Sequence, residues 1–356
     1  MEKPELLENI VETLKKEGFE VALSRIQCSF DVVARRNLIV LIIKALVNLD
    51  TFSEEHAWDL KILSKALKAT PLVVGIKTKL GPIGNSTVYS RHNINCISLD
   101  TLVDLFVEGN PPLVYADRGG FFVEVDGNLI KEEREKRGMS IGHLAEVIGV
   151  SKSSIYEFEN LEKRISVDSV LKIEKELDIG ITKPIYIIKV GGKEESEIIH
   201  ESPVEAARSD LEKTVFGDLS NKGFEVFPTK RTPFNALLKE REILITGISN
   251  TKTYIFEKKA EIVASISDIT EKDAMFVLPK KPASLLKSIL VKETAPVNVS
   301  FDTKNSIFTL SNYKMVCRQI DARYPNYNAV IPKSGPTKII VDRLALLSGV
   351  KRVSVC

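Results

Sequence analysis

The sequence predicts a multidomain protein of mixed α/β and α+β class, in which two α/β segments flank a small all-α module and a β-rich segment follows. Three observations support this prediction. Helical and strand periods alternate over the first 120 residues, short helices with serine or glycine at their ends fill residues 127–180, and the opening pattern returns after residue 203. The chain has 356 residues, which is enough for two or three domains.

Composition excludes several classes of protein. The chain has 50 Lys+Arg and 48 Asp+Glu, so its bulk charge does not identify a nucleic-acid binder, and any DNA contact must be local. Its four cysteines lie far apart and it has only four histidines, so we expect no disulfide framework, no metal site and no cofactor. No apolar run reaches the ~18 residues of a membrane span, and no signal peptide opens the chain, so we expect a cytoplasmic protein without a membrane partner.

The first 120 residues are predicted to form an α/β sandwich. Apolar residues recur at helical spacing from Pro4 to Glu17, and Gly18 ends that helix. A second helix is expected after Ser53, which would cap it. Strands are expected at residues 19–24, 31–34, 38–46 and 71–75.

Residues 181–277 are predicted to form a second, degenerate α/β domain that duplicates the first and opens with a strand at residues 181–190. The tetrapeptide Gly-Phe-Glu-Val occurs at residues 18–21 and again at residues 223–226. Asp31 then precedes Ile39 by eight positions, as Asn235 precedes Ile243. These matches indicate an internal duplication.

Residues 278–356 show a different sequence pattern. Alternating strands are expected in the segments VNVSF, SIFTL and KMVCRQI, with turn signals between them and a helix at residues 283–290. This pattern predicts β-hairpin architecture.

Residues 127–180 are predicted to be a helix-turn-helix module. Helices are expected at residues 128–137, 141–148, 152–160 and 167–177. The tight turn at Gly149 and Val150 would fix the angle between the second and third of these helices. The third helix could then project its first side chains into a DNA major groove.

Two sets of side chains in this module are candidates for contact with double-stranded DNA. The candidates for groove contact are Ser151, Lys152, Ser153, Ser154 and Tyr156, and the candidates for backbone contact are Arg134, Lys136 and Arg137. Residues 127–180 contain nine Lys/Arg and eleven Asp/Glu, so an alternative is a helical hairpin that does not touch DNA. Small Ser and Lys residues at the start of the third helix favour the DNA-binding interpretation.

The segment LIKEEREKRGMSIGHLAEVIGVSKSSIYEFEN resembles the Cro/C1-type helix-turn-helix. Ile141 departs from that pattern, because the family usually has Gln there, in contact with phosphate or base. The resemblance implies sequence-specific DNA binding and transcription regulation. Because such modules usually act in pairs on half-sites about one helical turn apart, it also implies a homodimer.

The segment GFEVALSRIQCSFDVVARRNLIVLIIKAL resembles the restriction-endonuclease-like fold, in which two carboxylates hold Mg²⁺ and a lysine steadies the attacking water. Asp31 and Lys44 occupy vestigial nuclease positions, but Ile42 stands where the second acid is required. In the second copy, Asn235 replaces the Asp and Ile248 replaces the Lys. We therefore expect a protein that is not an enzyme, and a Mg-dependent nuclease is the disfavoured alternative.

The order of nuclease-like domain, helix-turn-helix module and second α/β copy resembles a family of archaeal transcriptional regulators of helix-turn-helix type, over residues 1–277. The remaining segment resembles part of the bacterial DNA polymerase III β sliding clamp, most specifically at residues 323–327 and at Asp342-Arg343. That resemblance places Pro325 and Val330 near a pocket for partner peptides, but the rest of the pocket wall is absent, so such partners are not expected. A clamp fragment acting in replication is the alternative function, and a chimera joined near residue 277 is the simplest account of the two resemblances.

Overall fold

A computed structural model describes residues 1–161, 164–188, 202–240, 242–249 and 254–277, and four short segments beyond them at 297–301, 305–309, 314–318 and 337–341. The chain divides into two compact units. The first comprises Met1–Val21, Arg36–Ala57 and Ala69–Lys193, and the second comprises Ala22–Arg35, Trp58–Lys68 and Glu194–Cys356. Within the described residues, no helix is both long enough and apolar enough to cross a membrane.

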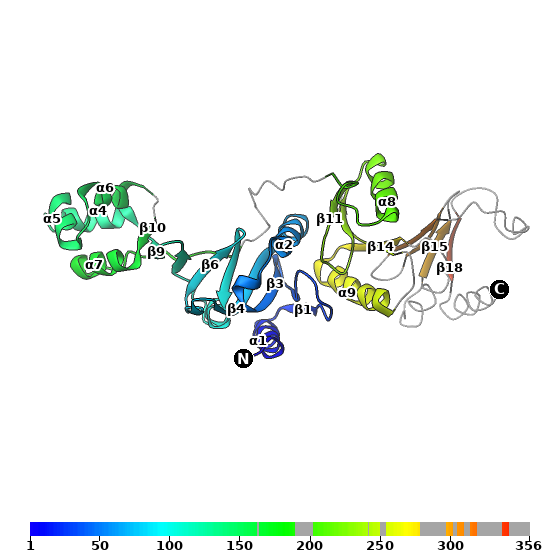
Figure 1. Ribbon diagram of the computed structural model, residues 1–356, viewed down its shortest axis with the longest axis horizontal. Coiled ribbons are helices and arrows are strands. Elements are labelled where there is room, and N and C mark those ends of the chain that lie inside the picture. The colour runs from blue at the N-terminus through cyan, green and yellow to red at the C-terminus, as the bar shows by residue number, and fades with distance from the viewer. Residues whose placement is uncertain are drawn as a thin grey trace, which may run out of the picture. The chain divides into compact units, whose positions relative to one another are not determined.

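The N-terminal α/β segment is built around a mixed sheet (Figure 1). Its elements are α1 (Lys3–Lys16), β1 (Glu20–Leu23), β2 (Val32–Arg36), β3 (Ile39–Asn48), a 3-10 turn (Leu49–Thr51), α2 (Glu54–Leu67), β4 (Thr70–Thr78), β5 (Gly81–Pro82), β6 (Thr87–Arg91), β7 (Ile94–Ser98), α3 (Leu99–Phe106), β8 (Val114–Asp117) and β9 (Gly120–Glu124). In this sheet β3, β4 and β7 are parallel, and β6 and β7 are antiparallel.

The strand order explains the apolar runs in the sequence. The order is β1-β2-β3-β4-β7-β6-β8-β9, continued by β10 (Arg164–Ser166), and β3 lies parallel to β4 with Leu41 opposite Thr70. Leu41, Ile42 and Ile43 are all fully buried, as a strand covered on both faces requires. The predicted strands and helices of residues 1–78 are therefore confirmed, with shifts of one to three residues at their ends.

The helical module consists of α4 (Gly127–Lys136), α5 (Ile141–Ile148), α6 (Lys152–Asn160) and α7 (Val167–Leu177). The hydroxyls of Ser140, Ser151 and Ser166 each accept a hydrogen bond from a backbone N–H in the first turn of the helix that follows, as the sequence predicts. Gly149 ends α5 in the left-handed conformation with φ of 80°.

The module is not wholly helical, which corrects the prediction. Strand β10 separates α6 from α7 and pairs antiparallel with β9, with Ile165 opposite Val123. Both of these side chains are buried in the core that the four helices share. The short ribbon therefore closes one side of the helical core.

The strand expected at residues 181–190 is wrong for the part that the structure describes. Residues 181–188 make one isolated bridge, between Thr182 and Val125, and no ladder. Pro184 has no N–H to donate to a ladder. The apolar side chains of Ile181, Ile185 and Ile187 are nevertheless buried, and this burial accounts for the misleading pattern.

The second unit contains another α/β segment with elements in the same order as the first. Its elements are α8 (Asp210–Asn221), β11 (Glu225–Pro228), β12 (Ala236–Lys239), β13 (Ile243–Ile248), α9 (Tyr254–Thr270) and β14 (Asp273–Val277). The sheet order is β11-β12-β13-β14, and β13 lies parallel to β14 as β3 lies parallel to β4.

A separate antiparallel sheet has the order β17-β16-β15-β18. Its strands are β15 (Val297–Phe301), β16 (Asn305–Thr309), β17 (Lys314–Arg318) and β18 (Thr337–Val341). The first three confirm the alternating strands predicted from the sequence. The predicted helix at 283–290 and the clamp-like positions at 323–327, Val330 and Asp342-Arg343 lie outside the described residues.

Candidate nucleic-acid interface

The leading end of α6 is exposed to solvent. Ser151, Lys152 and Ser153 are exposed to solvent, and the Tyr156 side chain is 58% exposed. The C-terminal half of the same helix is anchored, because Ile155 and Glu159 are buried. This division leaves the leading end of α6 accessible to a large ligand.

Two of the predicted groove residues also have structural roles. The Ser151 hydroxyl accepts the backbone N–H of Ser154 at 3.0 Å, and the two serine hydroxyls lie 2.8 Å apart. The Lys152 side chain crosses the turn to lie over Gly142, where a Cβ would come within 2.8 Å of it. A residue larger than glycine at position 142 would displace Lys152 from this position.

Arg134 is not at the surface, which corrects the predicted backbone contact. Its side chain is 8% exposed, and its Nε and Nη2 atoms donate to the two carboxylate oxygens of Glu159 at 2.6 and 2.9 Å. Its Nη1 atom donates to the Met139 carbonyl at 2.9 Å. Hydrogen bonding to Glu159 raises the pKa of Arg134. Arg134 therefore joins α4, the α4–α5 turn and α6.

Lys136 and Arg137 are both exposed, as the sequence predicts, but each has a partner within the module. Lys136 forms an ion pair with Glu133 one turn earlier. Arg137 donates to the carbonyls of Glu176 and Leu177 at the end of α7. A phosphate contact from either residue would compete with these bonds.

Two further contacts, one at α6 and one at α5, help to hold the module together, and the sequence did not predict them. A Cβ on Gly127 would lie 2.4 Å from the Phe158 carbonyl oxygen, so only glycine lets α4 approach the end of α6 this closely. The Lys172 ammonium donates to the Ile148 carbonyl at 2.9 Å and so caps α5. Ile141, which stands where the Cro/C1-type pattern usually has Gln, packs against the hydrophobic core of the module.

The nuclease positions of the first α/β segment are buried. Asp31 is 4% exposed, Lys44 is 3% exposed and Ile42 is not exposed at all. Magnesium in such sites needs several oxygen ligands, and the apolar Ile42 offers none. In the described part of the chain, no three His, Cys, Asp or Glu residues gather as metal ligands.

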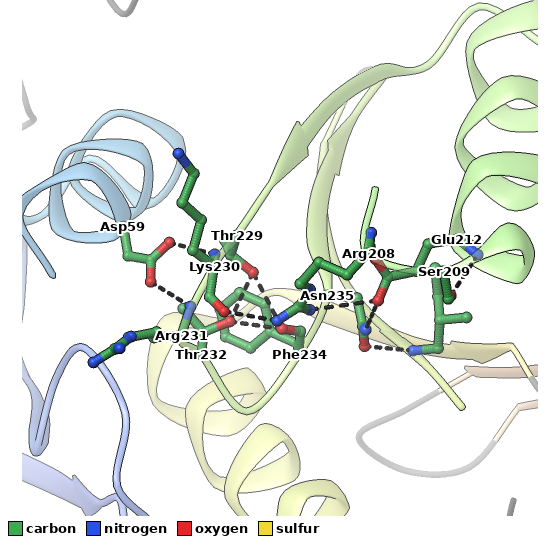
Figure 2. Close-up of polar contacts among 11 residues, drawn as sticks. Asp59, Arg208, Ser209, Glu212, Thr229, Lys230, Arg231, Thr232, Phe234 and Asn235 are labelled. Carbon is green, nitrogen blue, oxygen red and sulfur yellow. Dashed lines mark hydrogen bonds and ion pairs between the residues drawn. The ribbon is translucent and has the colours of Figure 1, made fainter. Parts of the chain in front are cut away.

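In the second α/β segment, Asn235, which the predicted duplication pairs with Asp31, is hydrogen-bonded within the segment. The Asn235 amide donates to Glu212 at 2.6 Å and its carbonyl accepts the Ile248 N–H at 2.7 Å (Figure 2). The other Glu212 oxygen accepts the Arg208 backbone N–H at 2.7 Å. Protein donors therefore satisfy Glu212, whose side chain is 8% exposed, and the arrangement does not fit a divalent cation.

A buried carboxylate from α2 holds the loop that precedes Asn235. Asp59 accepts the backbone N–H groups of Lys230 and Arg231 at 2.7 Å each (Figure 2). It also accepts the Ser29 hydroxyl at 2.6 Å. Burial raises the pKa of Asp59, and the hydrogen bonds from Ser29 and the loop oppose that rise. Nothing in the local sequence around Asp59 indicates this link between distant segments.

Two family models match the first α/β segment and the helical module. Residues 3–112 match the PD-(D/E)XK superfamily domain, and residues 130–183 match the helix-turn-helix family. The chain is thus a helix-turn-helix protein that also carries a restriction-endonuclease-like domain. A solved SinR protein/SinI protein complex is 26% identical over 27% of this chain and 92% of that chain, with a TM-score of 0.15.

Several relatives that align over most of their length come from archaea. The "Putative HTH-type transcriptional regulatory protein" of Pyrococcus abyssi is 37% identical and aligns with 83% of this chain and 92% of its own length. Proteins of the same name from Methanocaldococcus jannaschii and Methanocella arvoryzae are 36% and 34% identical and are covered over 86% and 96% of their lengths. The chain belongs to this family of HTH-type transcriptional regulatory proteins.

The similarity to this family extends beyond residue 277, near which the sequence predicts the joint of a chimera. An alignment with 83% of a 356-residue chain needs more residues than the 277 that precede Leu278. The family similarity therefore continues past Val277 and overlaps the clamp-like segment. The resemblance of that segment to a sliding clamp stays a prediction.

The buried ion pair gives a first prediction. Arg134→Ala leaves the Glu159 carboxylate buried without its main partner, so we expect a loss of about 3–5 kcal/mol in the stability of the module. Hydrogen-exchange mass spectrometry of peptides from α4 to α7 measures this loss. Lys136→Ala, which removes an exposed ion pair on the same helix, should leave hydrogen exchange close to that of the wild type. Equal exchange in the two variants would contradict the role given to Arg134.

The Asn235 network gives a second prediction. Asn235→Asp places a carboxylate beside Glu212, and the two acids then share a proton, which raises their apparent pKa above the usual ~4. A raised pKa means that the folded state binds the proton more tightly. Stability should therefore fall by about 1–3 kcal/mol at about pH 8 and recover as the pH is lowered toward about 5.

Thermal unfolding at the two pH values measures this effect. Asn221→Asp, at an exposed position at the end of α8, is the matched control and should show no such pH-dependent loss. A loss in Asn235→Asp that is independent of pH would show that the two side chains are not coupled.

Proposed function

We propose that this protein is a non-catalytic, sequence-specific regulator of transcription that reads the DNA major groove with the leading end of α6. The observation that carries the proposal is the contrast within α6. Its first residues are exposed, whereas its last turn is fixed by Arg134 and by the close approach of Gly127. A rigidly held helix with a free N-terminal end is the geometry that base readout requires.

Lys152, Ser153 and Tyr156 are the side chains that we assign to groove contact. Ser and Lys can donate to base edges, and the ring of Tyr156 offers an apolar surface. Ser151 and Ser154 support the helix start, and their hydroxyls can also approach a phosphate. Lys136 and Arg137 are assigned to the DNA backbone, where their charges favour phosphate.

We further propose that the regulator binds as a symmetric homodimer. One α6 helix covers only one half-site, and paired modules double the readout of a short recognition sequence. The local charge of the module, with nine Lys/Arg against eleven Asp/Glu in residues 127–180, gives single modules little non-specific affinity.

The two α/β segments are proposed to be copies of one ancestral nuclease-like domain that now serve as a scaffold. Their shared element order and the repeated Gly-Phe-Glu-Val motif support the duplication. Burial of Asp31 and Ile42 in the first segment, and the amide of Asn235 in the second, support the loss of cleavage.

The groove assignment predicts the effect of a charge reversal. Lys152→Glu combined with Ser153→Glu should abolish binding to duplex DNA, because carboxylates would face base-edge acceptors and phosphates. A mobility-shift assay with fragments of the organism's own promoters measures this. The control combines Lys175→Glu with Asn128→Glu, which changes the net charge equally at exposed sites of α7 and α4. Unaltered binding by the first variant would remove α6 from the readout.

The scaffold assignment predicts the absence of cleavage. Duplex, single-stranded and branched DNA incubated with Mg²⁺ or Mn²⁺ should remain intact, because neither α/β segment presents two carboxylates to a metal. Gel analysis of end-labelled substrates tests this. Cleavage by the wild-type protein that disappears in Asp31→Ala would overturn the non-catalytic assignment.

A further inference from the structure

Gly142 and Lys152 make a contact across the turn that joins α5 to α6. Gly142 is the second residue of α5, and Lys152 is the first residue of α6. An ideal Cβ at position 142 would lie 2.8 Å from the Lys152 Cε, 3.2 Å from its Nζ and 3.7 Å from its Cδ. The outer half of the Lys152 side chain therefore lies along the backbone of the first turn of α5.

The conformation of α5 does not require a glycine at position 142. Gly142 lies inside the helix, and its φ is not positive, in contrast to that of Gly149. Glycine is less favourable than alanine at a helical position, because it loses more conformational freedom on folding. The three atoms nearest to an added Cβ all belong to Lys152. Room for this side chain therefore accounts for the glycine.

The position of Lys152 does not stabilise the module either. The helix dipole disfavours a cation in the first turn of a helix, and Lys152 opens α6. Among the ion pairs and hydrogen bonds of the part of the chain that the structure describes, none includes the Lys152 ammonium. Glu146 follows Gly142 by one turn on α5, and Glu157 lies on α6, so the turn carries no excess of positive charge. General attraction to phosphate therefore does not explain the lysine.

A lysine that is already held in place is better suited to reading a base. A mobile lysine loses the freedom of its rotatable bonds when it binds, and this loss weakens the complex. Lys152 has given up part of that freedom in the unbound protein, because its outer half packs on α5. Its ammonium is a donor, and guanine presents two acceptors, O6 and N7, in the major groove.

We propose that Gly142 is a positioning residue for DNA recognition, which holds Lys152 in the orientation that reads a guanine. This inference rests on the proposed function, because it takes α6 as the helix that enters the groove. Gly142 acts through Lys152 and makes no base contact of its own. Residues that lower the stability of an element are expected where function requires them, and Gly142 and Lys152 both fit that description.

The test is a double-mutant cycle on the full chain. It measures the dissociation constant for a duplex that the wild type selects from a random library, and for duplexes in which single guanines of that site are changed. The proteins are the wild type, Gly142→Ala, Lys152→Ala and the double variant. Gly180→Ala is the matched control, because an added Cβ there meets nothing within 4 Å and its φ is not positive either.

We expect Gly142→Ala to bind the selected site about three- to tenfold more weakly, because Lys152 must then be ordered during binding. The penalty for changing the guanine that Lys152 contacts should become smaller as well. In the Lys152→Ala background, Gly142→Ala should change the affinity by less than about twofold. Hydrogen exchange of α5 peptides should be no faster in Gly142→Ala than in the wild type, since alanine favours the helix.

Three results would overturn the positioning role. The first is an affinity of Gly142→Ala equal to that of Gly180→Ala, or a loss that is the same with and without Lys152. The second is an equal loss on every duplex sequence, which would place Lys152 at the phosphates. The third is faster exchange in α5, which would assign the loss to the helix itself.

Failure of this inference and failure of the proposed function give different results. Selective binding by the wild type without coupling between Gly142 and Lys152 would contradict the positioning role and leave the regulator in place. A wild-type protein that selects no sequence would contradict the regulator, and the role of Gly142 with it.

Discussion

The bidentate ion pair between Arg134 and Glu159 is the constraint on which the helix-turn-helix module depends. It joins α4 to the last turn of α6 at 2.6 and 2.9 Å, and the third guanidinium nitrogen holds the turn before α5. A pair buried this deeply contributes geometry more than net stability, because desolvation offsets much of the attraction. The ion pair fixes the position of α6, and the N-terminal end of that helix remains exposed.

The N-terminal half of α6 is defined by local chemistry, and the sequence predicts it well. Serine caps and the left-handed Gly149 depend on neighbours within a few residues, so the bounds of α5 and α6 are confirmed to the residue. The role of Arg134 was not predicted, although a signal was present. Ile130 and Arg134 lie one turn apart on the buried face of α4, and an arginine on such a face requires an acid opposite it.

The contacts that join distant segments could not be predicted in this way. Asp59 is an ordinary helix residue in the sequence, and only the folded chain shows that it binds the loop at Lys230 and Arg231. Burial of Ile181, Ile185 and Ile187 against other elements imitated a strand, and Pro184 was the local sign against it. Ile42, in contrast, was visible from the resemblance to the restriction-endonuclease-like fold, and Asn235 from the predicted duplication. Their consequences for metal binding follow from side-chain chemistry alone.

The central claim is that α6 enters the major groove of DNA and selects its sequence. Selection of bound sites from a random duplex library by the full-length protein tests it most directly. The account predicts a recovered motif with two inverted half-sites whose centres lie about one helical turn apart, and interference when guanine N7 in those half-sites is methylated. Recovery of no motif, or of one that major-groove methylation leaves unaffected, would contradict the account.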